Sequence, residues 1–310
     1  MYSLVIPVYR NASSLPQLVE IVADFPSRLD GPFEVVFVID GSPDDSLTVL
    51  QRLLPDATLR ATILALSRNF GSFAAIRVGI EAARGRYLAI MAADLQEPPE
   101  LALEIFRRLR DGQSDVVVGT RTSRSDPLPA RLAAGIFWGI YRRFIQPEMP
   151  RGGVDVFGCN DAVRQALLRI HERNTSLIGL LFWVGFRRLE VTYRRQPRQG
   201  GDRGAWSLAR KFRSMQDSIF AFSDLPVRLL LWMGAGGMAL AGLLGLVILT
   251  ARLVGDIEVP GYTALALLVL FFGALNLASI GIVGSYVWRA FENTKGRPGA
   301  VVLFQERFEP

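Results

Sequence analysis

The sequence predicts an α/β domain, built on a mostly parallel β-sheet, that is followed by two transmembrane helices. Short apolar runs alternate with helical patterns over residues 1–120, and a polar turn follows each of the first four runs. Two long stretches near the C-terminus lack charged residues. Continuous apolar strands separated by helices are typical of a parallel sheet that is covered on both faces.

The elements of the α/β domain are expected to alternate along the chain. Strands are expected at residues 2–8, 33–39, 61–66, 87–91 and 116–119, and helices at residues 14–25, 44–54, 73–83 and 99–110. The pattern then changes, with a helix expected near 131–145 and another strand at 187–193. Ligands of such sheets bind beyond the carboxyl ends of the strands. The polar turns are therefore expected to form one site, and they lie at 7–11, 40–46, 67–71 and 93–96.

The two uncharged stretches predict a transmembrane hairpin. Residues 229–251 and 261–288 contain no charged side chain, and each run is longer than the roughly twenty residues that cross a bilayer. A long buried core helix is the alternative. Basic residues precede the first run and follow the second, which by the positive-inside tendency places both termini and the α/β domain in the cytoplasm. The expected location is the inner (cytoplasmic) membrane, as a multi-pass protein.

Four segments are expected along the chain: an α/β domain at 1–205, a juxtamembrane helix at 206–226, the hairpin at 227–290 and a cytoplasmic tail at 291–310. Apolar residues near the second segment recur at alternating steps of four and three, which makes one apolar stripe. That stripe predicts a helix in the membrane interface; a helix packed on the globular domain is the alternative. Gly281 and Ser285 have the small-xxx-small spacing of associating helices, so a homo-oligomer is a further expectation.

The composition of the chain excludes some classes of binding partner and of catalytic site. The net charge is +6, but the arginines are spread along the chain without an aromatic-interleaved basic motif. Membrane lipids and phosphate groups are therefore expected as partners, and nucleic acid is not. One cysteine, Cys159, excludes an intrachain disulfide and fits a reducing compartment. One histidine, His171, excludes a histidine-based triad or a zinc cluster.

The turn after the fourth strand has the donors of a divalent-cation site. Asp94 and Gln96 are two residues apart, so an extended turn directs both toward the same side. Both offer oxygen, which Mg²⁺ and Mn²⁺ prefer and usually share with phosphate oxygens. Ala92 stands where a second acid would complete the set. The turn therefore predicts a nucleotide-diphosphate site with a reduced metal shell.

The chain resembles the polyprenyl-phosphate glycosyltransferases of glycosyltransferase family 2, in particular the dolichol-phosphate-mannose-synthase-like group with a C-terminal hairpin. The resemblance covers nearly the whole chain and implies a GT-A fold. It also implies inverting transfer of a sugar from a UDP- or GDP-sugar to a polyprenyl phosphate, undecaprenyl phosphate being expected, for cell-envelope glycan modification. The segments that carry it are Val5-Ile6-Pro7-Val8-Tyr9, Val38-Ile39-Asp40-Gly41-Ser42, Leu66-Ser67-Arg68-Asn69-Phe70-Gly71, Ala93-Asp94-Leu95-Gln96-Glu97-Pro98-Pro99-Glu100, Gly119-Thr120-Arg121 and residues 218–228.

The resemblance assigns the nucleotide-sugar side of the site to the first three turns. Pro7, Tyr9 and Asp40 are expected to line the nucleoside pocket. Asn69 and Gly71 open a helix whose free N–H groups favour anions. Simple packing of Tyr9 and a turn-capping role of Asp40 are the alternatives.

Two carboxylates are expected to be catalytic, Asp94 and Asp155. Asp94 is expected to hold Mg²⁺ or Mn²⁺ against the pyrophosphate, with Gln96 as a second ligand or as its hydrogen-bonding partner. The family usually has an acid at Ala92, so weaker metal affinity without the nucleotide is expected. Asp155 is either a base or a positioning group, and positioning is favoured because a phosphate monoester is already largely ionised at pH 7. Capping of the helix after Asn160 is the alternative for Asp155.

Four arginines match phosphate-binding positions of the family. Arg121 and Arg131 are expected to bind the acceptor phosphate, since a planar guanidinium suits that group. Arg198 and Arg203 lie in a glycine-containing loop that is expected to contact the diphosphate of the nucleotide sugar. Gly204 stands in this loop where the family usually has serine. Solvated surface charge is the alternative for each arginine.

Two other functions fit parts of the sequence. A catalytically silent, membrane-anchored nucleotide-sugar-binding scaffold would explain Ala92. A processive polysaccharide synthase would share the fold, but the chain lacks the Gln-x-x-Arg-Trp signature of those enzymes and has only two expected spans.

Overall fold

The computed structural model describes residues 1–121, 139, 142–143, 146–150, 153–172, 175–196, 219–220, 222–223, 225–254 and 262–309. The chain divides into two compact units. The first comprises Met1–Lys211 with Arg297–Pro310, and the second comprises Phe212–Gly296. Each unit is described by itself.

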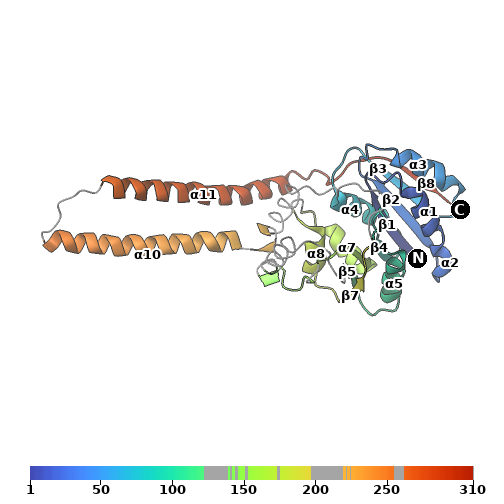
Figure 1. Ribbon diagram of the computed structural model, residues 1–310, viewed down its shortest axis with the longest axis horizontal. Coiled ribbons are helices and arrows are strands. Elements are labelled where there is room, and N and C mark those ends of the chain that lie inside the picture. Colours follow the sequence, from blue (N-terminus) through green and yellow to red (C-terminus); the bar gives the residue numbers. More distant parts are fainter. Residues whose placement is uncertain are drawn as a thin grey trace. The chain divides into compact units, whose positions relative to one another are not determined.

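The first unit contains one eight-stranded sheet with helices on both faces (Figure 1). Its strands are β1 (Tyr2–Val8), β2 (Phe33–Ile39), β3 (Ala61–Leu66), β4 (Tyr87–Ile90), β5 (Val116–Arg121), β6 (Val156–Asn160), β7 (Arg188–Tyr193) and β8 (Val302–Phe308). Its helices are α1 (Leu15–Ala23), α2 (Phe25–Arg28), α3 (Ser46–Leu53), the 3₁₀ helix η1 (Leu54–Asp56), α4 (Ser72–Ala82), α5 (Pro99–Arg110), α7 (Asp161–Arg169) and α8 (Leu177–Trp183).

The strand order is β7-β5-β6-β4-β1-β2-β3-β8. The pairs β4–β1, β1–β2, β2–β3 and β5–β7 are parallel, while β6 is antiparallel to both of its neighbours and β8 is antiparallel to β3. The carboxyl ends of β1, β2, β3 and β4 therefore meet at one edge of the sheet. This is the edge at which the sequence predicts the site.

Successive side chains of β1 point to opposite faces of the sheet, so the strand contributes to the apolar core on both faces. Leu4 and Ile6 belong to the main apolar core, which also takes side chains from α1, α3 and α5. Val5 points to the opposite face, where a Cβ built on Gly79 of α4 would lie 2.3 Å from its Cγ1. The close approach of α4 to the sheet therefore requires glycine at this position.

The predicted elements of residues 1–120 are confirmed, with ends that differ by a few residues. Two strands were outside the prediction. Strand β6 separates β4 from β5, and β8 adds an antiparallel edge beside β3, within the segment that the sequence assigns to a cytoplasmic tail. Side chains of β8 such as Phe304 and Phe308 pack against the core, while alternate ones are exposed. A seven-residue edge strand of this kind gives only a weak apolar signal.

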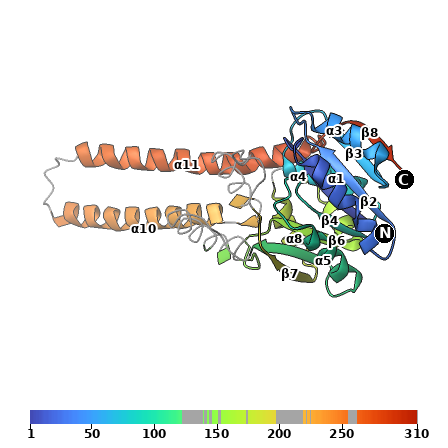
Figure 2. The same cartoon turned by 45° about the vertical axis from the view of Figure 1, so that its right-hand side comes forward.

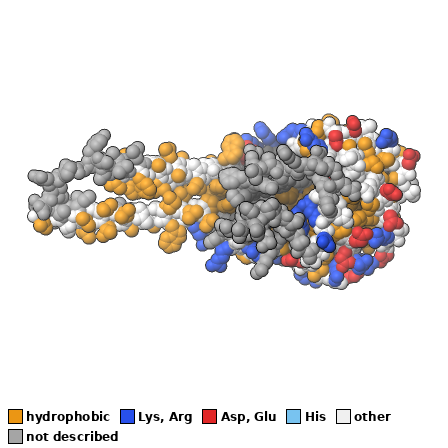
Figure 3. All heavy atoms as spheres, viewed as in Figure 1, with side chains coloured by type: hydrophobic (Ala, Val, Ile, Leu, Met, Phe, Trp, Pro, Cys, Tyr) orange, Lys and Arg blue, Asp and Glu red, His pale blue; other side chains and the backbone are white. Residues whose placement is uncertain are grey.

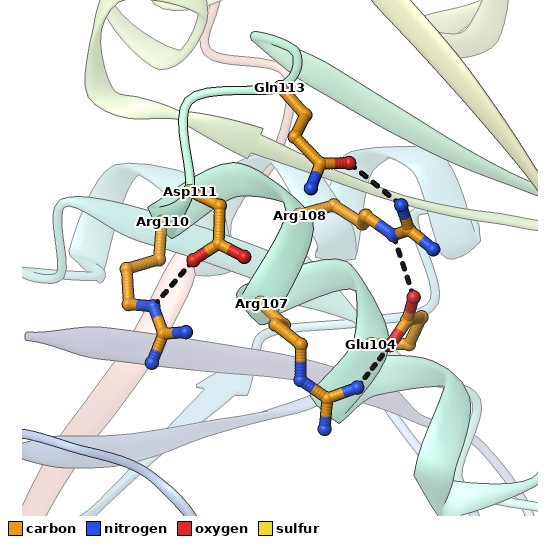
Figure 4. A network of polar contacts seen from close by, with 6 residues as sticks. All are labelled: Glu104, Arg107, Arg108, Arg110, Asp111 and Gln113. Carbon is orange, nitrogen blue, oxygen red and sulfur yellow. Dashed lines mark hydrogen bonds and ion pairs between the residues drawn. The ribbon is translucent and has the colours of Figure 1, made fainter.

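The last turn of α5 carries a polar network on the surface (Figure 4). Glu104 accepts hydrogen bonds from Arg107 at 2.5 Å and from Arg108 at 2.7 Å, the i,i+3 and i,i+4 spacings of a helix. Arg108 also donates to Gln113, and Arg110 to Asp111. Exposed pairs of this kind contribute about 0–1 kcal/mol each. The helix starts at the carboxyl edge of the sheet and ends at the opposite edge, so the network lies away from the site.

The second unit contains α10 (Leu225–Val254) and α11 (Tyr262–Thr294), which run side by side (Figures 1 and 2). Both are long and apolar enough to cross a membrane. Figure 3 shows hydrophobic side chains over the visible face of both helices, and Trp232 is among the most exposed. The Ser285 hydroxyl donates to the Gly281 carbonyl within α11, so this pair does not test the expected homo-oligomer. Most of the expected interfacial helix at 206–226 lies outside the described residues.

Candidate functional site

The turn after β4 is fixed from both sides. The Met91 N–H donates to the Val5 carbonyl at 3.1 Å, and the Ser14 hydroxyl donates to the Ala93 carbonyl at 2.7 Å. Leu95 has a φ of 54°, in the left-handed region that non-glycine residues rarely adopt. This conformation lets the Gln96 N–H donate to Asp94 Oδ1 at 3.3 Å. Asp94 and Gln96 therefore lie in one tight turn, but this turn is not extended as the sequence predicts, because Leu95 is left-handed.

Asp40, at the end of β2, holds the loop after β3. Its side chain is 3% exposed and accepts hydrogen bonds from the Phe70 N–H at 2.7 Å and the Gly71 N–H at 2.9 Å. Gly71 has a φ of 98° and precedes α4 directly. Asp40 therefore stabilises the start of α4, in addition to the nucleoside contact that the resemblance implies.

Gly41 lets this loop reach β2. Its φ is 55°, and a Cβ at this position would lie 2.3 Å from the Arg68 carbonyl carbon and 2.4 Å from the Asn69 nitrogen. Only glycine accommodates both the conformation and the close backbone approach. Arg68 lies over the Phe70 ring at 4.1 Å from its centroid. The predicted donor-side residues Asn69 and Gly71 therefore lie next to Asp40.

The first strand contributes Pro7 and Tyr9 at the same edge. Pro7 lies within β1, opposite Val38 of β2. Tyr9 is half-buried, and the Arg10 guanidinium lies 5.5 Å from the centroid of its ring. Next to them, Asp44 accepts from the Ser42 and Ser46 hydroxyls at 2.5 and 2.7 Å. The nucleoside-binding roles of Pro7, Tyr9 and Asp40 stay predictions.

Asp155 joins the predicted site from the start of β6. Arg121, the last residue of β5, donates to both of its carboxylate oxygens, from Nε to Oδ2 and from Nη2 to Oδ1 at 2.7 Å. The Tyr193 hydroxyl, at the end of β7, donates to Oδ2 at 2.9 Å. Asp155 therefore does not cap the helix after Asn160, since Asn160 itself accepts from the Val163 N–H in that position.

A buried carboxyl that the sequence analysis did not single out lies beside Asp94. Glu97 is 3% exposed, and its Oε2 has no hydrogen-bond partner among the described residues. Burial, with the negative charges of Asp94 and Asp155 nearby, raises the pKa of Glu97 to about 7, while Arg195 opposes that rise. Three carboxyl groups thus share one region of the site.

Arg195 connects the end of β7 with the turn that contains Asp94. It follows β7 and donates to Gln96 Oε1, and the Gln196 N–H donates to the Gln96 carbonyl at 2.8 Å. No local sequence pattern indicates this contact, because the partners are 99 residues apart. Three other predicted residues, Arg131, Arg198 and Arg203, lie outside the described residues.

The oxygen-bearing side chains of the turn after β4 suit a hard cation that is also coordinated by a bound ligand. The Asp94 carboxylate supplies oxygen at this turn, and Glu97 adds a buried carboxyl nearby. The Gln96 amide oxygen lies in the same turn and accepts a hydrogen bond from Arg195. Among the residues that the structure describes, no three His, Cys, Asp or Glu side chains are grouped to hold a metal ion by themselves. Mg²⁺ commonly takes one or two protein carboxylates and completes its shell with water and phosphate oxygens. The turn therefore suits a cation that arrives with a diphosphate.

Residues 3–170 match the family profile described as Glycosyl transferase family 2. The chain belongs to this family. The glycosyltransferase is 32% identical to an uncharacterized glycosyltransferase of Synechocystis sp. over 96% of its own length and 92% of the relative. It is 28% identical to a prophage bactoprenol glucosyl transferase homolog of Escherichia coli, with 97% of each chain covered. It is also 31% identical to an undecaprenyl-phosphate 4-deoxy-4-formamido-L-arabinose transferase of Yersinia enterocolitica, over 96% of its own length and 90% of the relative.

The glycosyltransferase is also similar to solved structures. Mannosyl-3-phosphoglycerate synthase from Rubrobacter xylanophilus aligns with a TM-score of 0.51 and 16% identity, over 76% of this chain and 75% of the other. A glucosyl-3-phosphoglycerate synthase from Mycobacterium tuberculosis, in complex with Mn²⁺ and UDP-glucose, aligns with a TM-score of 0.50 and 14% identity, over 71% and 77%. At these identities the similarity shows the fold. The predicted GT-A fold and glycosyltransferase family are therefore confirmed.

Proposed function

We propose that this glycosyltransferase transfers a sugar, with inversion, from a UDP- or GDP-sugar to a polyprenyl phosphate. The relatives over almost the full chain include proteins named for bactoprenol and undecaprenyl phosphate. Undecaprenyl phosphate is therefore the acceptor that we propose. Two helices long and apolar enough to cross a bilayer suit an acceptor that is dissolved in the membrane.

The observation that carries the proposal is the arrangement of polar groups at one sheet edge. Asp94 and Gln96 form one tight turn, Asp40 fixes the loop that precedes α4, and Asp155 pairs with Arg121. Such an edge offers oxygen ligands for a cation shared with a diphosphate on one side and a guanidinium for a second phosphate on the other.

The chemistry requires little from a protein base. An oxygen of the acceptor phosphate attacks the anomeric carbon, while the bond from that carbon to the diphosphate oxygen breaks and the nucleoside diphosphate leaves. The attacking phosphate monoester is already largely ionised at pH 7. In the structure Asp155 is engaged by Arg121 and Tyr193. We therefore assign Asp155 to positioning, and not to proton abstraction.

Mg²⁺ or Mn²⁺ would be held by Asp94 and Gln96 together with the diphosphate of the donor. When bound, the cation would stabilise the negative charge of the leaving nucleoside diphosphate. Arg198 and Arg203 would contact the same diphosphate, and Arg131 would join Arg121 at the acceptor phosphate. The complex of the M. tuberculosis neighbour contains Mn²⁺ with UDP-glucose, which supports a cation of this kind.

A donor panel tests this function. Detergent-purified full-length protein is incubated with undecaprenyl phosphate, Mg²⁺ or Mn²⁺, and a set of UDP- and GDP-sugars, and lipid-linked sugar is detected by mass spectrometry. We expect one lipid-linked monosaccharide from at least one donor. Nucleotide-sugar binding, seen as a thermal shift, without product from any donor would instead support the silent scaffold that Ala92 motivates.

We propose that the protein is a multi-pass protein of the inner membrane, with the catalytic domain and both termini in the cytoplasm. Cys159 is fully buried and burial raises its thiol pKa to about 12, so the native cysteine reacts poorly with impermeant maleimide. In intact cells an Asp256→Cys variant, in the loop between the spans, is expected to be labelled, and an Asp56→Cys variant is not. The reverse labelling pattern would overturn this orientation.

A further inference from the structure

Three side chains from three strands converge at one end of the sheet. In the parallel pair of β5 and β7, Arg121 lies opposite Tyr193 in register. Asp155 immediately precedes β6, which pairs with β5 on its other side, and its N–H donates to the Gly119 carbonyl at 3.4 Å. The strand order β7-β5-β6 places Arg121 between the other two residues, and hydrogen bonds bring the Asp155 carboxylate against both the guanidinium and the Tyr193 phenol.

Glycine at position 119 allows this approach. A Cβ at Gly119 would lie 2.6 Å from Val156 Cγ2 and 3.5 Å from Tyr193 Cε1. A Cβ here would meet the Val156 side chain, so glycine leaves room for β5 to pack closely against the start of β6.

The three side chains differ in exposure. The Tyr193 residue is 6% exposed, whereas the Arg121 and Asp155 side chains are each 23% exposed. Burial raises the pKa of the Tyr193 phenol, with the negative charge of Asp155 as the next cause, so the hydroxyl keeps its proton over the physiological range. The buried phenol is therefore a permanent donor, and the guanidinium is the part that a ligand can reach.

Arg121 keeps donors for a ligand while it is paired. A guanidinium has five N–H bonds, and the pair with Asp155 uses two of them, on Nε and Nη2. Three N–H bonds, on Nη1 and Nη2, lie outside this pair, and the Tyr193 side chain is a further hydrogen-bonding neighbour of the guanidinium. Arg121 and Thr120 also line a cavity of about 410 Å³, together with Arg142, Glu148 and Glu190. The guanidinium therefore borders open space while it is paired with Asp155.

We propose that Tyr193 is a positioning residue for the acceptor phosphate and acts through Asp155 and Arg121. The phenol fixes Asp155, the carboxylate fixes the plane of the Arg121 guanidinium, and the Arg121 N–H bonds outside this pair then face the phosphate oxygens. Without the phenol, Asp155 gains rotational freedom and the guanidinium loses its fixed plane. This inference rests on the proposed function, because it assigns Arg121 to the acceptor.

The test is the kinetics of a Tyr193→Phe variant with Tyr87→Phe as the matched control. Tyr87 is a half-buried tyrosine at the start of β4, at the opposite edge of the sheet. Loss of one hydrogen bond to a charged group costs roughly tenfold. We expect Tyr193→Phe to raise the KM for undecaprenyl phosphate about tenfold, while the KM for the nucleotide sugar stays within about twofold of wild type.

A double-mutant cycle shows whether Tyr193 acts through Asp155. If it does, Tyr193→Phe adds no further rise in acceptor KM once Asp155→Ala is present, whereas independent effects would add. An Arg121→Lys variant cannot donate two hydrogen bonds to the Asp155 carboxylate at once, so it is expected to raise the acceptor KM as well. This variant tests the same contact if Tyr193→Phe does not fold. An unchanged acceptor KM in Tyr193→Phe, or equal rises in both KM values, overturns the positioning role. Absence of product from the wild type would instead overturn the proposed function.

Discussion

Replacement of Glu97 by glutamine is expected to change how the stability of the protein depends on pH. Glu97 is 3% exposed, and its buried carboxyl has a pKa of about 7, compared with an ordinary value of 4.5. Between these two values the folded protein keeps a proton that the unfolded chain has released. The contribution of Glu97 to stability is therefore fully present below about pH 4.5 and is lost as the pH rises through about 7.

The size of this effect follows from the two pKa values. At about 1.4 kcal/mol for each pKa unit, the difference between 4.5 and about 7 corresponds to about 3 kcal/mol of unfolding free energy at pH 8. A Glu97→Gln variant has no proton to lose, so it escapes this loss. We expect the variant to gain stability relative to wild type between pH 5 and pH 8 by up to that amount.

The assay is the thermal unfolding of the detergent-purified full-length protein with EDTA, from pH 5 to pH 8. Glu100→Gln is the matched control, because the Glu100 side chain is 67% exposed and lies only three residues further along the chain. The difference in Tm between Glu97→Gln and wild type should grow with pH, while the difference in Tm between Glu100→Gln and wild type should stay constant. Parallel curves for Glu97→Gln and wild type would refute the buried, protonated state of Glu97.

Two further substitutions test the donor side of the site. Asp40→Ala removes a buried carboxylate that accepts two backbone N–H bonds, so it is expected to lower the unfolding free energy by about 3 kcal/mol or more, measured by urea unfolding of the full-length protein. Ala92→Asp adds the carboxylate that the turn lacks, so it is expected to tighten Mn²⁺ binding about tenfold or more in the absence of nucleotide, measured by calorimetry. If Asp40→Ala is as stable as wild type, Asp40 does not stabilise the start of α4. If Ala92→Asp binds Mn²⁺ with unchanged affinity, the turn does not bind the cation.

The sequence predicts the parts of the fold that depend on local pattern. Strands β1, β2 and β3 are apolar runs with one polar residue each, and helix α5 begins at Pro99 as expected from its pattern. Strand β6 was missed because its five residues include Gly158 and Cys159 and carry no clear alternation. Strand β8 was missed because it pairs with β3 across more than two hundred residues, and only half of its side chains touch the core.

The site shows the same division between local and distant information. The motif turns identify Asp94, Gln96 and Asp155, and the structure places them at the sheet edges where the topology requires them. The partners Tyr193 and Arg195 depend on the register of β7 beside β5, which no local pattern specifies. Glu97 belongs to the motif at residues 93–100, but its burial depends on the packing around the turn and not on the motif itself.

The most direct test of the account is the transfer reaction of wild type, Asp94→Ala and Asp56→Ala with undecaprenyl phosphate and the best donor of the panel. Asp56 is an exposed acid at the end of η1 and serves as the control. We expect a lipid-linked sugar from wild type and from Asp56→Ala. We expect a rate about a hundredfold or more lower for Asp94→Ala, since the leaving diphosphate loses its charge stabilisation. An Asp94→Ala variant that transfers sugar at the wild-type rate would contradict the central claim.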